Sequence, residues 1–363
     1  MRRVKMTPNK YITALKPYRP IPHSIWNMKN LNQVLKLDWN ESTIPPSPKV
    51  FAALQNALTE SNLHWYPNTH NTELLEQISL YTQLPQECIE VFASSDCAHE
   101  FILQVFAMPQ DTICIIAPTY DNFRARAEGI GLKTLFFQTQ DDYMLDFDAL
   151  DSFLCINKPK IVYLCNPNNP TGTLHDINAL THIITKHKHI LFVIDEAYYE
   201  FCKQSVIALL PHTHNLIITR TFSKAFGLAS FRIGYCLSSK TNIDSLNKLK
   251  NPKSITHFSQ IAAHVALQDI DYMTKYVDEV TLAREQFTKN LRLLSDFKIY
   301  PSQANFVLVK YPYIHKILDF LQLRQIFIRD YSHILPNHCR ISIGTREQMD
   351  YVAQTLKEYQ CNK

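Results

Sequence analysis

Six short apolar runs, separated from one another by stretches with helical periodicity, constrain the fold of this sequence more than any other feature. They are TICIIAP (112–118), KTLFFQ (133–138), KIVYLCNP (160–167), HILFVIDEAY (189–198), NLIITRTFSK (215–224) and FRIGYCL (231–237). A continuous run rich in β-branched residues is typical of a strand covered on both faces, and helical connections permit parallel pairing. Residues 48–250 therefore predict an α/β fold with a mostly parallel sheet covered by helices.

A different pattern begins after residue 255. A long helical stretch (259–296) precedes three short apolar runs, NFVLVKY (305–311), IFIRDY (326–331) and CRISIGT (339–345). These three runs predict a small three-stranded sheet. We therefore expect a large domain over residues 46–254 and a smaller α+β domain over residues 255–363. Residues 1–45 show little periodicity, and we expect them to form an N-terminal arm that packs on another part of the protein.

Composition excludes several classes of function. The 363 residues are 46% hydrophobic, which is enough for a sizeable core. The formal net charge is only +4, so the sequence lacks the excess of basic residues that is typical of proteins that bind nucleic acid or membrane surfaces. Nine cysteines include no CxxC pair, so neither zinc-site spacing nor a disulfide framework is expected. No apolar run reaches the length of a membrane span. We expect a soluble, reduced, cytoplasmic protein without a bound metal.

Glycine is scarce, with six in the whole chain and no GxGxxG motif, which disfavours a Rossmann dinucleotide site. Each remaining glycine is expected at a backbone position that a Cβ would disturb. Gly172, Gly227 and Gly234 all lie in segments that other features single out.

Polar residues follow three of the apolar runs at the point where each predicted strand ends. Asn169 follows the first of them, Asp195 and Tyr198 end the second, and Lys224 ends the third. Ligand sites of open α/β sheets form beyond the carboxyl ends of the strands. Taken alone, Asp195 is equally compatible with a helix cap, and Lys224 with a side chain that extends to solvent. Their coincidence at one edge instead predicts a functional site.

A lysine opposite a carboxylate suits pyridoxal 5′-phosphate, which needs an amine for its aldehyde, an acid for its ring nitrogen and an anion site for its phosphate. Lys224 and Asp195 would supply the first two. Arg232, with the hydroxyls of Thr221 and Ser223, would supply the third. Residues 94–96, before a helical pattern, offer a second anion site, although an ordinary helix cap explains that segment equally well.

Several segments resemble fold-type-I aminotransferases of the histidinol-phosphate aminotransferase group. They are CNPNNPTG (165–172), DEAYYEF (195–201), TRTFSKAFGLASFRIGY (219–235) and CRISIGTRE (339–347), extended by LKPYRP (15–20), WYPN (65–68), PTYDNF (118–123), ANFVLV (304–309) and IFIRD (326–330). The resemblance runs in order along almost the whole chain. It implies a large pyridoxal phosphate domain, a small domain and a homodimer with shared active sites.

The resemblance also implies roles for individual residues. Lys224, Asp195 and Tyr198 match the catalytic group, in which Lys224 forms the Schiff base and Asp195 partners the ring nitrogen. The matching cofactor-binding residues are Ser95, Asp96, Tyr120, Asn169, Thr221, Ser223, Arg232 and a tyrosine donated across the dimer, Tyr66. The matching substrate-binding residues are Tyr18, Asn40, Arg329 and Arg340.

The sequence departs from the family pattern at several positions, some of which lie along walls that could touch the substrate. The family segment Asn-Glu-Asn-Pro-Tyr-Gly is here NESTIPP (40–46), Ser94 replaces a glycine, Cys97 replaces a glutamate, and Trp65 replaces a residue that is often basic. Trp65 would narrow a pocket if it faced one. Cys97 fits either a reactive thiol or a packing residue. The histidine pairs 187/189 and 212/214 lack a third ligand at metal-site spacing.

The expected function is amino-group transfer between glutamate and a small phosphorylated ketone. Imidazole-acetol phosphate is the acceptor implied by the family. Dihydroxyacetone phosphate, in a sugar or capsule pathway, is an alternative, and so is decarboxylation of a phosphorylated amino acid. A regulator that binds pyridoxal phosphate would need a DNA-binding module, for which there is no signal. A catalytically dead relative would be expected to lack Lys224 or Asp195, and both are present.

Overall fold

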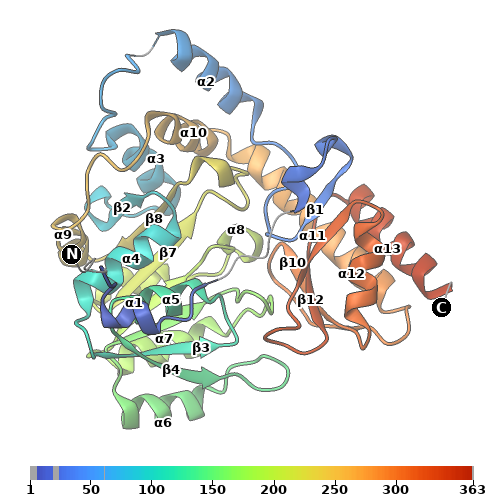
Figure 1. Ribbon diagram of the computed structural model, residues 1–363. Helices are drawn as coiled ribbons and strands as arrows, with labels where there is room; N and C mark the ends of the chain where they lie inside the picture. Colours follow the sequence, from blue (N-terminus) through green and yellow to red (C-terminus); the bar gives the residue numbers. More distant parts are fainter. Residues whose placement is uncertain (1–5, 19–23, 61, 362–363) are drawn as a thin grey trace, which may run out of the picture.

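The computed structural model describes residues 6–18, 24–60 and 62–361, and in them the chain forms two β-sheets flanked by helices (Figure 1). The larger sheet has the strand order β2-β8-β7-β6-β5-β3-β4. Its strands are β2 (Ile89–Phe92), β3 (Thr112–Ala117), β4 (Lys133–Gln138), β5 (Ile161–Cys165), β6 (Leu191–Asp195), β7 (Leu216–Thr221) and β8 (Gly234–Ser238). Strand β8 runs opposite to the other strands and pairs antiparallel with both β2 and β7. The predicted α/β fold with a mostly parallel sheet is confirmed.

All six apolar runs form strands of this sheet. Every residue of β5, β6, β7 and β8 is buried, as expected for strands covered on both faces, whereas β4 at the sheet edge is partly exposed. Strand β2 was not predicted, because it has only four residues and one of them is charged. The buried carboxylate of Glu90 forms an ion pair with Lys250, which offsets the cost of burying a charge in the sheet.

Ten helices of the described residues belong to the part of the molecule that contains the larger sheet. They are α1 (Lys10–Ala14), α2 (Pro48–Glu60), α3 (Thr72–Thr82), α4 (Ser95–Phe106), α5 (Asn122–Gly129), α6 (Phe147–Asn157), α7 (Ile177–Lys186), α8 (Tyr199–Cys202), α9 (Lys240–Asn247) and α10 (His257–Leu267). In α1, α4, α6, α7 and α10 a side chain caps the first turn. The carboxylate of Asp176 caps α7 by accepting a hydrogen bond from the Ala179 amide at 2.7 Å. Leu180, Ile183 and Ile184 then face the core at helical spacing.

The second sheet has five strands rather than the three expected. In the order β1-β11-β12-β10-β9 they are β1 (Leu35–Leu37), β11 (Ile326–Asp330), β12 (His338–Ser342), β10 (Phe306–Lys310) and β9 (Lys298–Ile299). The two additional strands have three and two residues, too few to produce a pattern in the sequence. Strand β1 comes from the predicted arm and pairs in parallel with β11. Residues 1–5 and 19–23 of that arm lie outside the described residues.

The long helical stretch after residue 255 is two helices. Helix α10 ends at Leu267, and α11 (Ile270–Leu291) begins three residues later. Helix α10 contacts α2 and α3 of the larger part, whereas α11 contacts α13 (Arg346–Cys361); α12 (Ile314–Gln322) packs on β11. The two parts lie side by side in Figure 1, with α11 leading from one to the other. We propose that the small domain begins at α11 rather than at residue 255.

Gly234 brings the start of β8 into close contact with the start of α4. A Cβ at this position would lie 2.7 Å from the backbone nitrogen of Ser95 and 2.8 Å from the carbonyl oxygen of Arg220. Both neighbours are backbone atoms, so relief requires a movement of the helix or the sheet. The expectation that a side chain is excluded here is confirmed.

We expect Gly234→Ala to destabilise the protein by about 1–3 kcal/mol, the usual range for overpacking of a filled site. Gly129→Ala is the matched control, because the nearest atoms to its added Cβ lie at the ordinary contact distance of 3.6 Å and Gly129 ends a helix. Thermal unfolding of both variants measures the difference. A Gly234→Ala melting temperature equal to that of Gly129→Ala would show that the close approach of β8 to α4 at Gly234 does not limit stability.

Candidate active site

A cavity of about 640 Å³ lies where the carboxyl ends of β5, β6 and β7 face the second sheet. Thirteen of the fifteen residues predicted for the site line it: Tyr18, Ser95, Asp96, Tyr120, Asn169, Asp195, Tyr198, Thr221, Ser223, Lys224, Arg232, Arg329 and Arg340. Tyr66 and Asn40 do not. The structure therefore brings together residues that lie more than 300 positions apart in the sequence.

Lys224 lies on the wall of this cavity, just beyond the end of β7. Its Nζ donates a hydrogen bond to the carbonyl oxygen of Trp39 at 3.0 Å. Desolvation, helped by the positive charge of Arg340, lowers the pKa of the Lys224 ammonium to about 8. At pH 7 about a tenth of the amine is then unprotonated, far more than in an ordinary lysine, which makes it a better nucleophile for a carbonyl compound.

Asp195, the last residue of β6, is a buried carboxylate that lines the same cavity. One oxygen accepts a hydrogen bond from the Tyr163 hydroxyl at 2.8 Å, and the other accepts one from the Ala197 amide at 3.1 Å. Burial raises the pKa of Asp195, while nearby donors act in the opposite direction. Such a carboxylate is suited to hold a cationic group that enters from the cavity.

Asn40 lies behind the cavity wall and not in it. Its Nδ2 donates to the Tyr198 hydroxyl at 3.0 Å, and its backbone amide donates to Ser342. Asn40 is almost fully buried. The resemblance implied a direct contact with substrate, but in this structure Asn40 orients Tyr198, whose hydroxyl keeps its proton because burial raises the pKa.

One end of the cavity collects groups that bind anions. Helix α4 begins at Ser95 and Asp96, and its first amides are free to bind a negative ion. Across from them, the hydroxyls of Thr221 and Ser223 lie 3.0 Å apart, and Arg232 also lines the cavity.

Ser94 preserves the backbone geometry of the glycine that it replaces. It has φ 116° and ψ 164°, a conformation that strongly favours glycine. Its hydroxyl accepts a hydrogen bond from the Cys97 amide at 3.2 Å, so the residue still caps α4. This departure from the family pattern therefore leaves the start of the helix in place.

Arg329 and Arg340 project from adjacent strands, as the two apolar runs predicted. They are direct partners in the antiparallel pairing of β11 with β12. The guanidinium of Arg340 donates to Asn169 at 2.6 Å and to the carbonyl oxygen of Asp38 at 2.6 Å. Arg329 is only 8% exposed, and it forms no hydrogen bond or ion pair with any residue in the described part of the chain. The alternative of a surface pair with Asp330 or Glu347 is therefore wrong.

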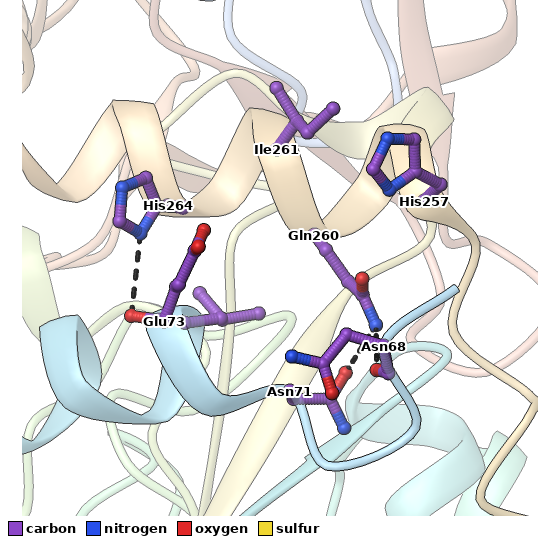
Figure 2. A pocket seen from close by; sticks show the side chains of 8 residues that line it. Asn68, Asn71, Glu73, His257, Gln260, Ile261 and His264 are labelled. Carbon is purple, nitrogen blue, oxygen red and sulfur yellow. Dashed lines mark hydrogen bonds between the residues drawn. The ribbon is translucent and has the colours of Figure 1, made fainter. Parts of the chain in front are cut away.

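Tyr66 lies outside the cavity on an exposed segment. It is 75% exposed, and its ring is covered by the ammonium of Lys253 at 4.3 Å. Figure 2 shows a smaller cavity, of about 190 Å³, beside this segment. There Gln260 of α10 donates to the carbonyl oxygen of Asn68 and to the side chain of Asn71, both at 2.7 Å. The Tyr66 segment is thereby fixed to α10.

Tyr331 is a cavity residue that was not predicted. Its hydroxyl lies 3.1 Å from a guanidinium nitrogen of Arg340 and 3.3 Å from Asn169. It follows Arg329 by two positions, so strand alternation was the signal that would have placed both on one face. Trp26 and Trp39 also line the cavity, whereas Trp65 does not and is 67% exposed.

Two further features of the sequence have ordinary explanations in the structure. His187 has neighbours from another helix, since Asp151 and Cys155 lie beside it. Both carboxylate oxygens of Asp151 are already hydrogen-bonded, one to His187 at 2.8 Å and one to Lys186 at 2.7 Å, and we assign no metal to this group. Burial raises the pKa of the Cys97 thiol, which favours a packing role over a reactive thiolate.

The donor set of the main cavity fits pyridoxal phosphate. A nucleophilic amine, a buried carboxylate with an open side and a helix N-terminus flanked by hydroxyls are the three groups that this cofactor requires. Among the described residues, no helix is long and apolar enough to cross a membrane.

Comparisons with known proteins agree with this geometry. The profile of the family "Aminotransferase class I and II" matches residues 32–356. A dihydroxyacetone phosphate transaminase of Campylobacter jejuni is 51% identical over 98% of this chain and 97% of its own length. A histidinol-phosphate aminotransferase of Thermoanaerobacter pseudethanolicus is 31% identical over 89% of this chain and 92% of its own. The crystal structure of histidinol-phosphate aminotransferase from Sinorhizobium meliloti with pyridoxal-5′-phosphate covers 98% of both chains at a TM-score of 0.89 and 26% identity.

With a family profile over most of its length and a cavity that presents the amine, carboxylate and anion site of the cofactor, the chain belongs to the class I and II aminotransferases and is a pyridoxal phosphate-dependent enzyme of fold type I.

Proposed function

We propose that this enzyme transfers an amino group from glutamate to a small phosphorylated ketone, and that dihydroxyacetone phosphate is a better acceptor than imidazole-acetol phosphate. The relative with 51% identity is named for the first acceptor, whereas the relatives named for histidinol phosphate are about 30% identical. From the sequence alone, the resemblance to histidinol-phosphate aminotransferases favoured imidazole-acetol phosphate. The higher identity over nearly the full length reverses that preference.

The observation that carries the proposal is the pair of facing arginines in the cavity. Arg329 and Arg340 are both buried and line the cavity, and Arg329 has no anionic partner among the described residues. Two guanidinium groups side by side repel each other, so an anion between them would be strongly favoured. Phosphate and carboxylate both match the planar fork of arginine. A site of this kind suits a glutamate that alternates with a phosphorylated acceptor.

Aromatic side chains form part of the cavity walls. Trp26 and Trp39 both contribute to the lining, and Tyr18 packs edge-on against Tyr120 with ring centroids 5.6 Å apart.

Each cavity residue has a chemical task in this proposal. The cofactor, when bound, supplies an electron sink for the carbon that loses its proton. Lys224 would hold the cofactor aldehyde and afterwards move the proton at the substrate α-carbon, for which a lowered pKa is suitable. Asp195 would keep the ring nitrogen protonated. Tyr198 and Asn169 would hydrogen-bond the ring hydroxyl, and Tyr120 would cover the ring face.

The anion-binding end would receive the phosphate of the cofactor. The first amides of α4, at Ser95 and Asp96, and the side chains of Thr221, Ser223 and Arg232 surround this region. The Asp96 carboxylate itself accepts a hydrogen bond from the Tyr120 hydroxyl at 3.3 Å. This bond restrains the aromatic ring that would lie over the cofactor.

An assay of several acceptors with glutamate tests the proposed function. We expect formation of 2-oxoglutarate with dihydroxyacetone phosphate, at a kcat/KM about ten-fold or more above that for imidazole-acetol phosphate, a difference of about 1.4 kcal/mol. Lys224→Ala protein is the blank. A preference for imidazole-acetol phosphate would overturn the choice of acceptor. A preference for unphosphorylated keto acids would overturn the phosphorylated substrate.

Arg329 and Arg340 should respond differently to mutation. Arg329→Gln removes a charge-assisted hydrogen bond of about 1.5–3 kcal/mol, so the half-reaction with the phosphorylated acceptor should slow by about 10- to 150-fold, and that with glutamate should slow much less. Arg340→Gln should weaken both half-reactions. The exposed Arg346, which pairs with Glu279, provides the matched control Arg346→Gln. The single-turnover rate of each half-reaction measures these effects. If Arg329→Gln slows both half-reactions equally, Arg329 does not bind the phosphate of the acceptor.

The exposed position of Tyr66 supports a homodimer with shared sites. Tyr66 cannot reach the cavity of its own chain as placed, and apolar residues around it are exposed, among them Leu63 and Trp65. Helix α2 at the far edge of the molecule (Figure 1) adds exposed Phe51 and Leu58. A second copy would cover these side chains and receive Tyr66 at its cofactor phosphate.

Mixing two inactive variants tests this arrangement. In a heterodimer of Lys224→Ala and Tyr66→Ala chains, one site carries both changes and the other carries neither. Random exchange should therefore restore on the order of a quarter of wild-type activity, measured at a cofactor concentration too low for Tyr66→Ala protein alone. Tyr351→Ala, at another exposed tyrosine, should need no rescue. No gain on mixing, or an active monomer in sedimentation, would exclude the shared site.

A further inference from the structure

The Tyr163 hydroxyl is the closest side-chain partner of the Asp195 carboxylate. Tyr163 lies in the middle of β5 and is fully buried, and its hydroxyl donates to Oδ2 of Asp195 at 2.8 Å. Phe123 stacks on its ring, with centroids 4.1 Å apart and an interplanar angle of 15°. The hydroxyl is thus held in place by packing on β5 and α5, on the side of the carboxylate away from solvent.

His99 of α4 approaches the same carboxylate oxygen. Its Nε2 lies 3.9 Å from Asp195 Oδ2 and 2.9 Å from the hydroxyl of Thr219. Its Nδ1 is buried and has no hydrogen-bond partner among the described residues. A proton on Nδ1 would therefore be unpaired, which favours the tautomer with the proton on Nε2. In that tautomer the N–H on Nε2 donates to the Thr219 hydroxyl, and the Asp195 carboxylate lies 3.9 Å from the same nitrogen.

These donors oppose the effect of burial on Asp195. Burial favours the neutral acid, and the nearby carboxylate of Asp96 acts in the same direction. His99, Tyr163 and the Ala197 amide favour the ionised form. A hydrogen bond to the charged form of a buried carboxylate stabilises that form in particular.

We propose that Tyr163, supported by His99, is a positioning residue that keeps Asp195 ionised, so that the proton between this carboxylate and the ring nitrogen of the cofactor stays on the nitrogen. The inference rests on the proposed role of Asp195. Without the Tyr163 hydroxyl, the carboxylate becomes the stronger base and draws the proton toward itself. The ring then loses positive charge, and removal of the substrate α-proton becomes slower.

The 15N chemical shift of the ring nitrogen measures the location of the proton directly. Wild-type enzyme reconstituted with pyridoxal phosphate labelled with 15N at the ring nitrogen should give a solid-state NMR signal in the protonated range. Asp195→Asn should give the neutral range. Tyr163→Phe should give an intermediate shift, together with a loss of kcat of about ten-fold and little change in KM.

Two more variants complete the experiment. Tyr311→Phe is the matched control, because Tyr311 is equally buried but belongs to the second part of the molecule, and it should leave the signal unchanged. His99→Leu should move the 15N signal in the same direction as Tyr163→Phe but less far. If Tyr163→Phe does not fold, His99→Leu provides the test.

The outcomes separate the two proposals. A wild-type signal in the protonated range that stays unchanged in Tyr163→Phe, or in His99→Leu where only that variant folds, overturns the role of Tyr163 and leaves that of Asp195. A neutral ring nitrogen in the wild type, or no change in Asp195→Asn, overturns the proposed role of Asp195 and with it the inference about Tyr163.

Discussion

The parallel pairing of β5, β6 and β7 determines where the amide of Asn169, the carboxylate of Asp195 and the amine of Lys224 lie. In register, Cys165 pairs with Asp195, and Asp195 pairs with Thr219. Because the three strands run in the same direction, the segments that follow them leave the sheet at one edge. An amide, a carboxylate and an amine that are distant in sequence therefore meet around one cavity. The complete burial of these strands fixes their register, and with it the spacing of the groups.

The larger sheet and the cofactor side of the cavity could be predicted because their signals are local. Six of the sheet's seven strands are continuous apolar runs, and Asn169, Asp195 and Lys224 lie at the end of such a run or just beyond it. Features that depend on distant contacts could not be predicted. Strand β1 has three residues and exists only because β11 lies beside it. Asn40 contacts Tyr198 and Ser342 through a fold that its own neighbours do not reveal. Tyr163 looks in sequence like any core tyrosine of a strand.

On the side of the second sheet, the cavity is lined by two buried arginines that form no ion pair within the described part of the chain. Arg340 is held by neutral oxygen atoms, from Asn169, Tyr331 and the carbonyl of Asp38, and Arg329 has no partner in the described part of the chain. Neutral acceptors satisfy the hydrogen bonds of a guanidinium but do not cancel its charge. The same charge contributes to the lowered pKa of Lys224. An anionic substrate would therefore act on the amine as well as on the arginines, since it would reduce the field that keeps the ammonium destabilised.

The segment from Leu35 to Asn40 connects these two sides of the site. At one end it forms β1, which pairs with the strand that carries Arg329. At the other end the Trp39 carbonyl accepts the hydrogen bond from Lys224, and Asn40 holds Tyr198. Between them the Asp38 carbonyl accepts from Arg340. A displacement of the second sheet would move all three contacts together, because a segment this short, bonded at both ends, has little freedom to absorb it. The backbone carbonyls of two consecutive residues, Asp38 and Trp39, thus connect the guanidinium of Arg340 to the amine of Lys224.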